Sequence, residues 1–293
     1  MRLATYRHGG SLCVGVVDDG SVRPLEGADA DRPLTTMLDV INRFDEVRDP
    51  PDPAAGATSH PLADVELLAP LPRPPRNILC VGKNYREHAE EFDRSGFNAT
   101  ATGTVPDAPM VFTKPPEAVT GHGASIRLPR KVTECLDYEA ELAVVIGRAG
   151  RGISREEARR HVFGYTIVND ITARDLQARH SQWFLGKALD DSCPMGPWIV
   201  TADEIDPAAL RIRCWVNDEL RQEADTSALV FDVSTLIETI SAGTTLLPGD
   251  VIATGTPAGV GAGFTPPRFL ADGDRVRIEI SGIGTLENTV VAE

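Results

Sequence analysis

The stretch YEAELAVVI at residues 138–146 combines two glutamates with a run of apolar residues. Successive side chains of a β-strand point to opposite faces, so Glu139 and Glu141 are predicted to share one face. Two adjacent carboxylates on a half-buried strand repel each other unless a cation, a proton or a basic side chain neutralises them. A face exposed to water is the alternative, but the apolar run 143–146 argues against it. The segment therefore predicts a buried strand with a site for a divalent cation.

A second predicted strand supports the same site. Residues 165–170 (YTIVND) have the composition of a strand that ends in an acid, Asp170, and residues 172–177 begin a predicted helix. Together with Glu139 and Glu141, Asp170 would supply three hard oxygen ligands, and these suit Mg²⁺, Mn²⁺ or Ca²⁺ better than zinc. The sequence thus predicts a carboxylate site for a hard cation, with positions left for water and substrate.

Three side chains after Asp170 are candidates for contact with an anionic substrate. Arg174 and Gln177 lie one helical turn further on, where they could hold a carboxylate through charge-assisted hydrogen bonds. An exposed helix face is the alternative for this pair. Lys187 follows bulky apolar residues, so it is predicted either to be desolvated near the site or to extend to the surface.

A possible proton-transfer pair lies near the start of the main part of the chain. Residues 78–82 (ILCVG) predict a buried strand, followed by a helix with Asn84 as its N-cap. On this helix His88 and Glu91 are three residues apart and share a face. A histidine with a carboxylate in reach can draw a proton from water, whereas a surface contact is the alternative interpretation.

The length and pattern of the chain predict its domains. It has 293 residues, 42% of them hydrophobic, which is enough for a large core. Residues 1–69 predict a small β-rich N-terminal domain, with a helical pattern over 33–47, and the proline-rich residues 70–76 predict a linker. Residues 77–293 predict a mostly β domain with a few helices, so the fold class is mostly β with α (α+β). Within it, residues 92–108 are polar and aperiodic, consistent with a mobile lid or an inert loop.

Composition excludes several classes of function. The formal net charge of −14 disfavours binding to nucleic acid or to anionic membranes. The five cysteines are odd in number and form no C-x-x-C motif, which predicts free thiols. No signal-peptide or transmembrane pattern is present, so a soluble, cytoplasmic protein is expected. The glycine-rich residues 255–261 could bind an anion through backbone N–H groups, but they match neither a P-loop nor a dinucleotide motif.

The order and spacing of several motifs resemble the fumarylacetoacetate hydrolase family. The resemblance extends from about residue 76 to the C-terminus. The motifs that carry it are VGKNY at 81–85 with His88 and Glu91, KPP at 114–116, YEAEL at 138–142, GYT at 164–166 with ND at 169–170, TARD at 172–175, and GD at 249–250 with GTP at 255–257.

This resemblance implies a distorted β-roll for the main domain and a homodimer in solution. The residues up to 69 are similar to the variable N-terminal domain of longer members. The implied site has Glu139, Glu141 and Asp170 as ligands of Mg²⁺ or Mn²⁺, His88 and Glu91 as a water-activating dyad, Lys187 as a second catalytic positive group, and Arg174, Gln177 and Thr256 as substrate contacts.

One departure from the family pattern bears on the substrate. The fumarylacetoacetases proper have a further metal-binding aspartate before the catalytic histidine, whereas no acid lies between Arg76 and Arg86. The resemblance therefore implies a smaller bacterial-type member. Its expected reaction is hydrolysis of a carbon–carbon bond in an acylpyruvate or related 2,4-dioxo acid, such as fumarylpyruvate, through a metal-stabilised enolate. The alternatives are decarboxylation of oxaloacetate, isomerisation or hydration of an unsaturated 2-oxo diacid, and a catalytically silent binding protein.

Overall fold

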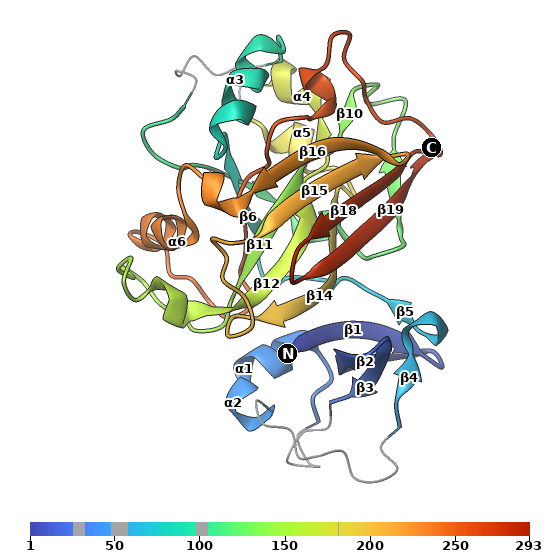
Figure 1. Cartoon of the computed structure of the whole chain (residues 1–293), viewed down its shortest axis with the longest axis vertical. Coiled ribbons are helices and arrows are strands. Elements are labelled where there is room, and N and C mark those ends of the chain that lie inside the picture. The colour runs from blue at the N-terminus through green and yellow to red at the C-terminus, as the bar shows by residue number, and fades with distance from the viewer. Residues whose placement is uncertain (26–32, 48–57, 98–104, 181) are drawn as a thin grey trace.

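Strands dominate the structure, and most of them lie in one large sheet (Figure 1). The computed structural model describes residues 1–25, 33–47, 58–97, 105–180 and 182–293. Within these ranges the strands form a twelve-stranded sheet, a five-stranded sheet and a two-stranded ladder. The predicted fold class, mostly β with α, is confirmed. Among the described residues, no helix has the length and apolar character needed to cross a membrane.

The N-terminal residues form an antiparallel meander with two short helices. The elements are β1 (Arg2–His8), β2 (Ser11–Asp18), β3 (Ser21–Pro24), α1 (Met37–Asn42), α2 (Phe44–Val47), β4 (His60–Pro61), the 3₁₀ turn η1 (Leu62–Asp64) and β5 (Glu66–Leu67). The helical pattern over 33–47 is split because the backbone leaves helical geometry at Arg43. β1 also pairs with β14 (Cys193–Thr201), so one sheet spans both predicted domains. The domain boundaries stay predictions.

The rest of the chain contributes the other strands of both sheets. These are β6 (Ile78–Gly82), β7 (Met110–Lys114), β8 (Val119–Thr120), β9 (Ser125–Leu128), β10 (Leu136–Asp137), β11 (Ala140–Ile146), β12 (Val162–Asn169), β13 (Thr172–Ala173), β15 (Arg211–Val216), β16 (Glu219–Asp225), β17 (Val251–Ala253), β18 (Arg275–Ile280) and β19 (Gly284–Ala292). The α-helices are α3 (Arg86–Arg94), α4 (Arg174–Arg179), α5 (Phe184–Lys187) and α6 (Val233–Ser241). The 3₁₀ turns are η2 (Pro116–Ala118), η3 (Ala158–His161), η4 (Thr226–Ala228) and η5 (Gly261–Gly263).

Strand order places β11 and β12 in the interior of the large sheet. The order is β4-β3-β2-β1-β14-β12-β11-β17-β6-β7, and the smaller sheet runs β16-β15-β18-β19-β9. β11 and β12 are antiparallel, with Ala140 opposite Asn169. This register brings the start of β11 beside the end of β12. Helices α3, α4 and α5 gather at that end of the molecule, and the N-terminal meander lies at the opposite end (Figure 1).

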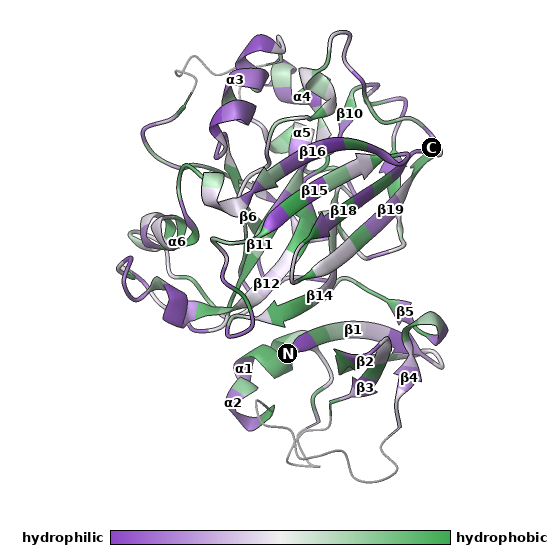
Figure 2. Ribbon diagram, in the orientation of Figure 1, coloured by the Kyte–Doolittle hydropathy of each residue, from purple (hydrophilic) through white to green (hydrophobic). Residues whose placement is uncertain are grey.

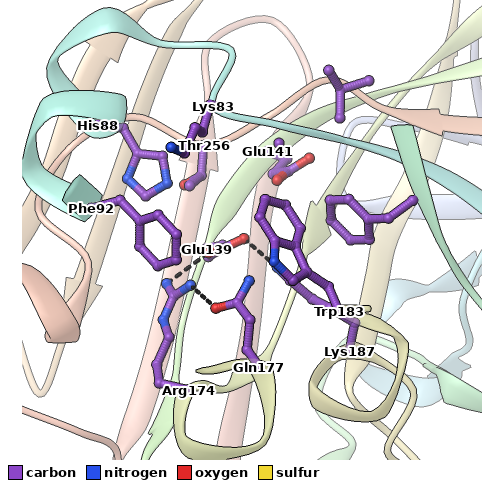
Figure 3. Close-up of a pocket in the computed structure, with 13 residues that line it drawn as sticks. Lys83, His88, Phe92, Glu139, Glu141, Arg174, Gln177, Trp183, Lys187 and Thr256 are labelled. Carbon is purple, nitrogen blue, oxygen red and sulfur yellow. Dashed lines mark hydrogen bonds and ion pairs between the residues drawn. The ribbon is translucent and has the colours of Figure 1, made fainter. Parts of the chain in front are cut away.

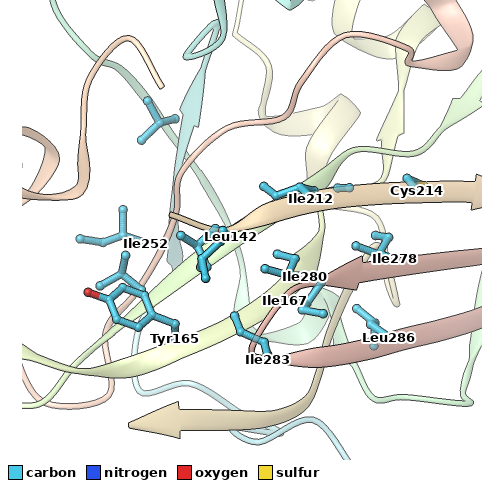
Figure 4. Close-up of a cluster of buried hydrophobic side chains, with 14 of the residues drawn as sticks. Leu142, Tyr165, Ile167, Ile212, Cys214, Ile252, Ile278, Ile280, Ile283 and Leu286 are labelled. Atoms are coloured by element: carbon cyan, nitrogen blue, oxygen red, sulfur yellow. The ribbon is translucent and has the colours of Figure 1, made fainter. Parts of the chain in front are cut away.

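Both faces of β11 are covered, which explains its uninterrupted apolar sequence. Leu142, Val144 and Ile146 pack into a large cluster shared with β15, β18 and β19. Ala143 and Val145 face a second cluster on the other side of the sheet. Figure 2 shows hydrophobic residues along β11 and β14 and hydrophilic residues on α3, and Figure 4 shows the large cluster around Leu142. This apolar body supports the polar end of β11. All five cysteines carry free thiols.

Candidate active site

The three predicted metal ligands converge in space. Glu139 lies directly before β11, Glu141 is the second residue of that strand, and Asp170 directly follows β12. The Asp170 N–H donates to the Glu139 carbonyl oxygen at 2.9 Å, which continues the β11–β12 pairing. One carboxylate oxygen from each residue lies within 4.8 Å of the others, and all three side chains are buried. The E-x-E face is therefore interior, and the alternative of a water-exposed face does not hold.

Buried cations surround this triad. Lys187 Nζ donates to Glu139 Oε2 and Asp170 Oδ2, each at 2.7 Å. Arg174 Nη2 lies 2.6 Å from Glu139 Oε1, and Lys114 Nζ lies 3.0 Å from Asp170 Oδ1. Burial opposes ionisation of Glu139, yet Lys187 and Arg174 hold its pKa at about 2. Of the two interpretations of Lys187, the structure selects the buried one, with 2% of the residue exposed.

Glu141 has a different environment from Glu139. Its Oε2 accepts a hydrogen bond from the Gly255 N–H at 2.8 Å. Burial, followed by the charges of Asp170 and Glu139, raises the pKa of Glu141 well above its usual range. Bringing a cation among the three carboxylates would remove this repulsion, and oxygen-only donors are those that Mg²⁺ and Mn²⁺ prefer. The residues present thus fit a hard divalent cation.

Arg174 is held in place by the protein itself. Its Nε donates to Asp137 Oδ2 at 2.9 Å, and its Nη1 donates to Gln177 Oε1 at 3.1 Å. Burial disfavours the charged form, but Glu139 and Asp137 raise the pKa of Arg174 above its usual range. The side chain is 1% exposed, so this face of α4 is interior. The guanidinium orients Glu139 and Gln177, and direct contact with a substrate carboxylate stays a prediction.

His88 and Glu91 lie inside the same region, on the buried face of α3. His88 Nδ1 is 3.5 Å from Glu91 Oε2, longer than an ordinary hydrogen bond. Glu91 accepts from the Gly259 N–H at 3.0 and 3.1 Å. A Cβ added at Gly263 would meet the Glu91 side chain, so a larger residue there would displace this carboxylate. The side chains of His88 and Glu91 are 6% and 15% exposed, which excludes a simple surface contact.

A small pocket is lined by several of these groups, namely Glu139, Glu141, Arg174, Lys187 and His88. Figure 3 shows Arg174 and Gln177 on one side and Lys83, His88 and Thr256 on the other. Thr256 Oγ1 accepts a hydrogen bond from Gln222 Nε2 at 2.8 Å. The wall is completed by the aromatic rings of Phe92, Phe112 and Trp183.

Comparison with known proteins identifies this arrangement. The family described as "Fumarylacetoacetate (FAA) hydrolase C-terminal" matches residues 77–291, and the family "Rv2993c-like, N-terminal" matches residues 1–70. The chain belongs to the fumarylacetoacetate hydrolase family. Relatives in this family include enzymes named as hydrolases and as a tautomerase. The predicted membership of the fumarylacetoacetate hydrolase family is therefore confirmed.

Individual relatives span nearly the whole chain. Oxaloacetate tautomerase YisK of Bacillus subtilis is 53% identical over 241 residues, which is 82% of this chain and 78% of the relative. The fumarylacetoacetate hydrolase of psychrophilic Exiguobacterium antarcticum is 42% identical, with a TM-score of 0.85 and complete coverage of both chains. Maleylpyruvate hydrolase of Sphingobium sp. SYK-6, in complex with manganese(II) and pyruvate, is 36% identical, with a TM-score of 0.80 over 100% of this chain and 99% of that one.

In this member of the fumarylacetoacetate hydrolase family, the glycine-rich segment 255–261 binds carboxylates of the protein. The N–H groups of Gly255 and Gly259 bind Glu141 and Glu91, as described above. Gly261 donates to Asp137 Oδ1 at 2.7 Å. The predicted anion-binding capacity of this loop is thus used to orient acids of the site.

The predicted N-cap of α3 is wrong. Tyr85 occupies the N-cap position without a side-chain hydrogen bond. The Asn84 amide instead donates to the carbonyl oxygens of Thr254 and Phe231, at 2.7 and 3.0 Å, and accepts from the Phe231 N–H at 2.8 Å. These contacts with residues distant in sequence outcompete the local cap and fix the turn between β6 and α3.

Sequence reasoning assigned no role to several residues of the site. Lys83 and Lys114 each stand at the end of an apolar strand, β6 and β7, which is an unusual place for a lysine and a usable signal. Asp137 directly precedes the YEAE motif. Trp183 had no distinguishing signal. The proposed lid at 92–108 includes residues 98–104, which lie outside the described residues, so that prediction stays untested.

Proposed function

We propose that this protein is a metal-dependent enzyme that enolises a small 2-oxo acid, and that its reaction is the keto–enol tautomerisation of oxaloacetate. The observation that carries the proposal is the convergence of the buried acidic triad with a pocket lined by two of its glutamates, Lys187 and His88. The 53% identity to an oxaloacetate tautomerase supports the same reaction.

The triad would hold Mg²⁺ or Mn²⁺, with Ca²⁺ as a further candidate. When bound, the cation would supply positive charge that polarises the 2-oxo group. Lys187 holds Glu139 and Asp170 in position through its two hydrogen bonds of 2.7 Å. The manganese in the maleylpyruvate hydrolase structure supports this choice of metal.

Tautomerisation transfers one proton between C3 and the 2-oxo oxygen. Because His88 Nδ1 faces Glu91, Nε2 is the ring nitrogen available to take the proton from C3. The Lys187 ammonium is a second group that could move a proton, at Nζ, and it adds positive charge near the developing oxyanion. Gln177 and Thr256 would orient the substrate, while Phe92, Phe112 and Trp183 exclude water.

The second candidate is the hydrolysis of an acylpyruvate, and the His88–Glu91 pair favours it. A water molecule next to His88 Nε2 would be activated for attack on the distal carbonyl carbon. The likeness to maleylpyruvate hydrolase supports this reaction. Decarboxylation of oxaloacetate would use the same enolate chemistry without an attacking water. A homodimer remains the expected assembly.

A direct assay separates these reactions. Metal-stripped protein, with and without Mn²⁺, Mg²⁺ or Ca²⁺, is mixed with the enol form of oxaloacetate, and loss of the enol absorbance is followed against the uncatalysed rate. Acceleration without release of carbon dioxide would support the tautomerase. Release of pyruvate plus a free acid from acetylpyruvate or fumarylpyruvate would instead establish the hydrolase. Full activity of Glu139→Ala in the presence of chelator would contradict the assigned site.

A further inference from the structure

Lys83 is a buried cation of the pocket to which the proposed chemistry gives no role. Its side chain is 1% exposed, and the residue lines the same pocket as His88, Glu139 and Glu141. It directly follows β6, whose last residue, Gly82, packs against the Trp183 ring. Burying a lysine side chain is costly unless its ammonium meets an acceptor. The acceptors that the Lys83 ammonium can reach therefore bear on its role.

The backbone holds this lysine in an uncommon conformation. Lys83 has φ +55°, in the left-handed region that residues other than glycine, asparagine and aspartate seldom adopt. The next residue, Asn84, is fully buried and locked by its three amide hydrogen bonds to Thr254 and Phe231. The turn is thus fixed by the surrounding structure, and it directs the Lys83 side chain into the pocket. Such conformations are concentrated at functional sites.

The contacts of Lys83 differ from those of the other buried cations near the triad. Lys114, Lys187 and Arg174 each contact a carboxylate of the acidic triad. Lys83 Nζ instead donates to Asp93 Oδ1 at 2.8 Å, near the end of α3, and Asp93 is 24% exposed. In Figure 3, Lys83 lies beside Thr256, across the pocket from Arg174 and Gln177. Positive charge is therefore present at both ends of the pocket.

We propose that Lys83 is a specificity-determining residue that binds the distal carboxylate of a dicarboxylic 2-oxo acid. This inference rests on the proposed function for the placement of the 2-oxo end at the triad. A second carboxylate buried at the opposite end needs its own cation, because an unpaired buried charge is strongly unfavourable. Asp93 can remain hydrated when Lys83 turns to the substrate, since part of its surface already meets water. Monocarboxylic 2-oxo acids would leave Lys83 paired with Asp93.

A pair of unreactive ligands isolates this contact from catalysis. Malate and 2-hydroxybutyrate differ only in the distal group, a carboxylate in one and a methyl group in the other. Binding of each to the Mn²⁺-loaded protein is measured by calorimetry. We expect the wild type to bind malate about tenfold more tightly or better, as for other charge-assisted hydrogen bonds. Lys83→Met should lose this preference and bind 2-hydroxybutyrate as the wild type does.

Two further variants separate a charge effect from a structural one. Lys83→Arg keeps the positive charge and should retain the preference for malate. Asp93→Asn removes the competing carboxylate and should keep or increase the preference. A loss of affinity for both ligands in Lys83→Met, with a lower melting temperature, would assign Lys83 a structural role and overturn the proposal.

Further outcomes distinguish a failure of the inference on Lys83 from a failure of the proposed function. A wild type without preference for malate, or a Lys83→Met variant that retains it, would also overturn the proposal. If the preference depends on Lys83 but oxaloacetate is not turned over, the inference on Lys83 stands and the proposed function fails. If oxaloacetate is turned over and Lys83→Met has an unchanged ratio of kcat/KM for oxaloacetate and acetylpyruvate, only the inference on Lys83 fails.

Discussion

The polar start of the segment 139–146 and its apolar remainder are both buried, but their burial is compensated in different ways. From Leu142 to Ile146 each side chain packs against apolar neighbours on one face of the sheet or the other. At Glu139 and Glu141 the neighbours are charges: Lys187 and Arg174 for the first, and Asp170 for the second. One continuous segment therefore contains a stabilising region and a region of unfavourable electrostatics.

The difference separates residues that stabilise the fold from residues proposed to serve activity. Apolar burial of Leu142 removes nonpolar surface from water and favours folding. Burial of Glu141 next to two carboxylates disfavours folding of the metal-free protein, because a charge there is poorly solvated. Substitutions at the acids should consequently lower activity more than stability, and substitutions at the apolar residues should lower stability more than activity.

The largest effect is expected for Glu141→Gln. This change removes one carboxylate of the triad, and kcat/KM in Mn²⁺ should fall by roughly 10³-fold, as for other losses of electrostatic stabilisation at a reacting group. The unfolding free energy of the metal-stripped protein should stay unchanged or rise, since the raised pKa already favours the neutral acid. Kinetics and urea unfolding measure the two quantities. Glu87→Gln, an exposed acid on α3, is the matched control. Wild-type activity in Glu141→Gln would contradict the assigned site.

Leu142→Ala, one residue along the same strand, should show the converse. The side chain is fully buried, and its truncation should lower the unfolding free energy by about 3 kcal/mol through lost burial and a residual cavity. The folded fraction should keep most of its kcat. Leu220→Ala, at an exposed leucine of β16, serves as the control in the same urea titration. A loss similar to that of the control would show that the core near the triad repacks freely.

His88→Gln separates proton transfer from metal binding within the polar region. Loss of the proton-transfer group should lower kcat by roughly 10²-fold. Binding of Mn²⁺ should change little, because His88 is not among the triad residues. Calorimetry with Mn²⁺ and a kcat measurement test both statements, with His8→Gln as an exposed control. A parallel loss of metal affinity would place His88 among the metal ligands instead.

The most gradual effect concerns pH. Folded Glu141 retains a proton that the unfolded chain releases above about pH 4. The unfolding free energy of the metal-stripped protein should therefore fall as pH rises from about 5 towards 8, by at most about 1.4 kcal/mol per pH unit for one such group. Glu139, with a pKa of about 2, acts oppositely and loses its stabilising contribution only as pH falls towards 2.

The comparison of urea unfolding at several pH values, with and without Glu141→Gln, isolates the first contribution. The difference in unfolding free energy between variant and wild type should grow with pH. A constant difference would mean that Glu141 is ionised in the metal-free protein.

Local patterns predicted much of the fold and of the site. Strands β1, β2, β6 and β12 follow the runs of apolar and β-branched residues closely, because such runs need burial on a sheet. The spacing of Glu139 and Glu141 placed both on one face, because the period of a strand is two. Resemblance to a family, rather than these patterns, suggested the β-roll.

Long-range contacts decided the remainder. Asn84 has the sequence context of a helix cap, but its amide binds Thr254 and Phe231, which are about 150 residues or more away in the chain. The pairing of Arg174 with Asp137 likewise follows from the β10–β13 ladder, in which Asp137 lies opposite Thr172. No local propensity encodes such contacts.

The sequence by itself determined the class of fold, the acidic triad and the histidine near it, since these depend on periodicity and on residue types with few alternative uses. The tertiary structure alone decided which cation neutralises which carboxylate. It placed Lys187 and Arg174 on Glu139, left Glu141 with a backbone N–H, and directed Lys83 to the other end of the pocket. The physical reason is that electrostatic interactions in a buried site depend on distances of a few ångströms, and only the packing of distant segments sets those distances.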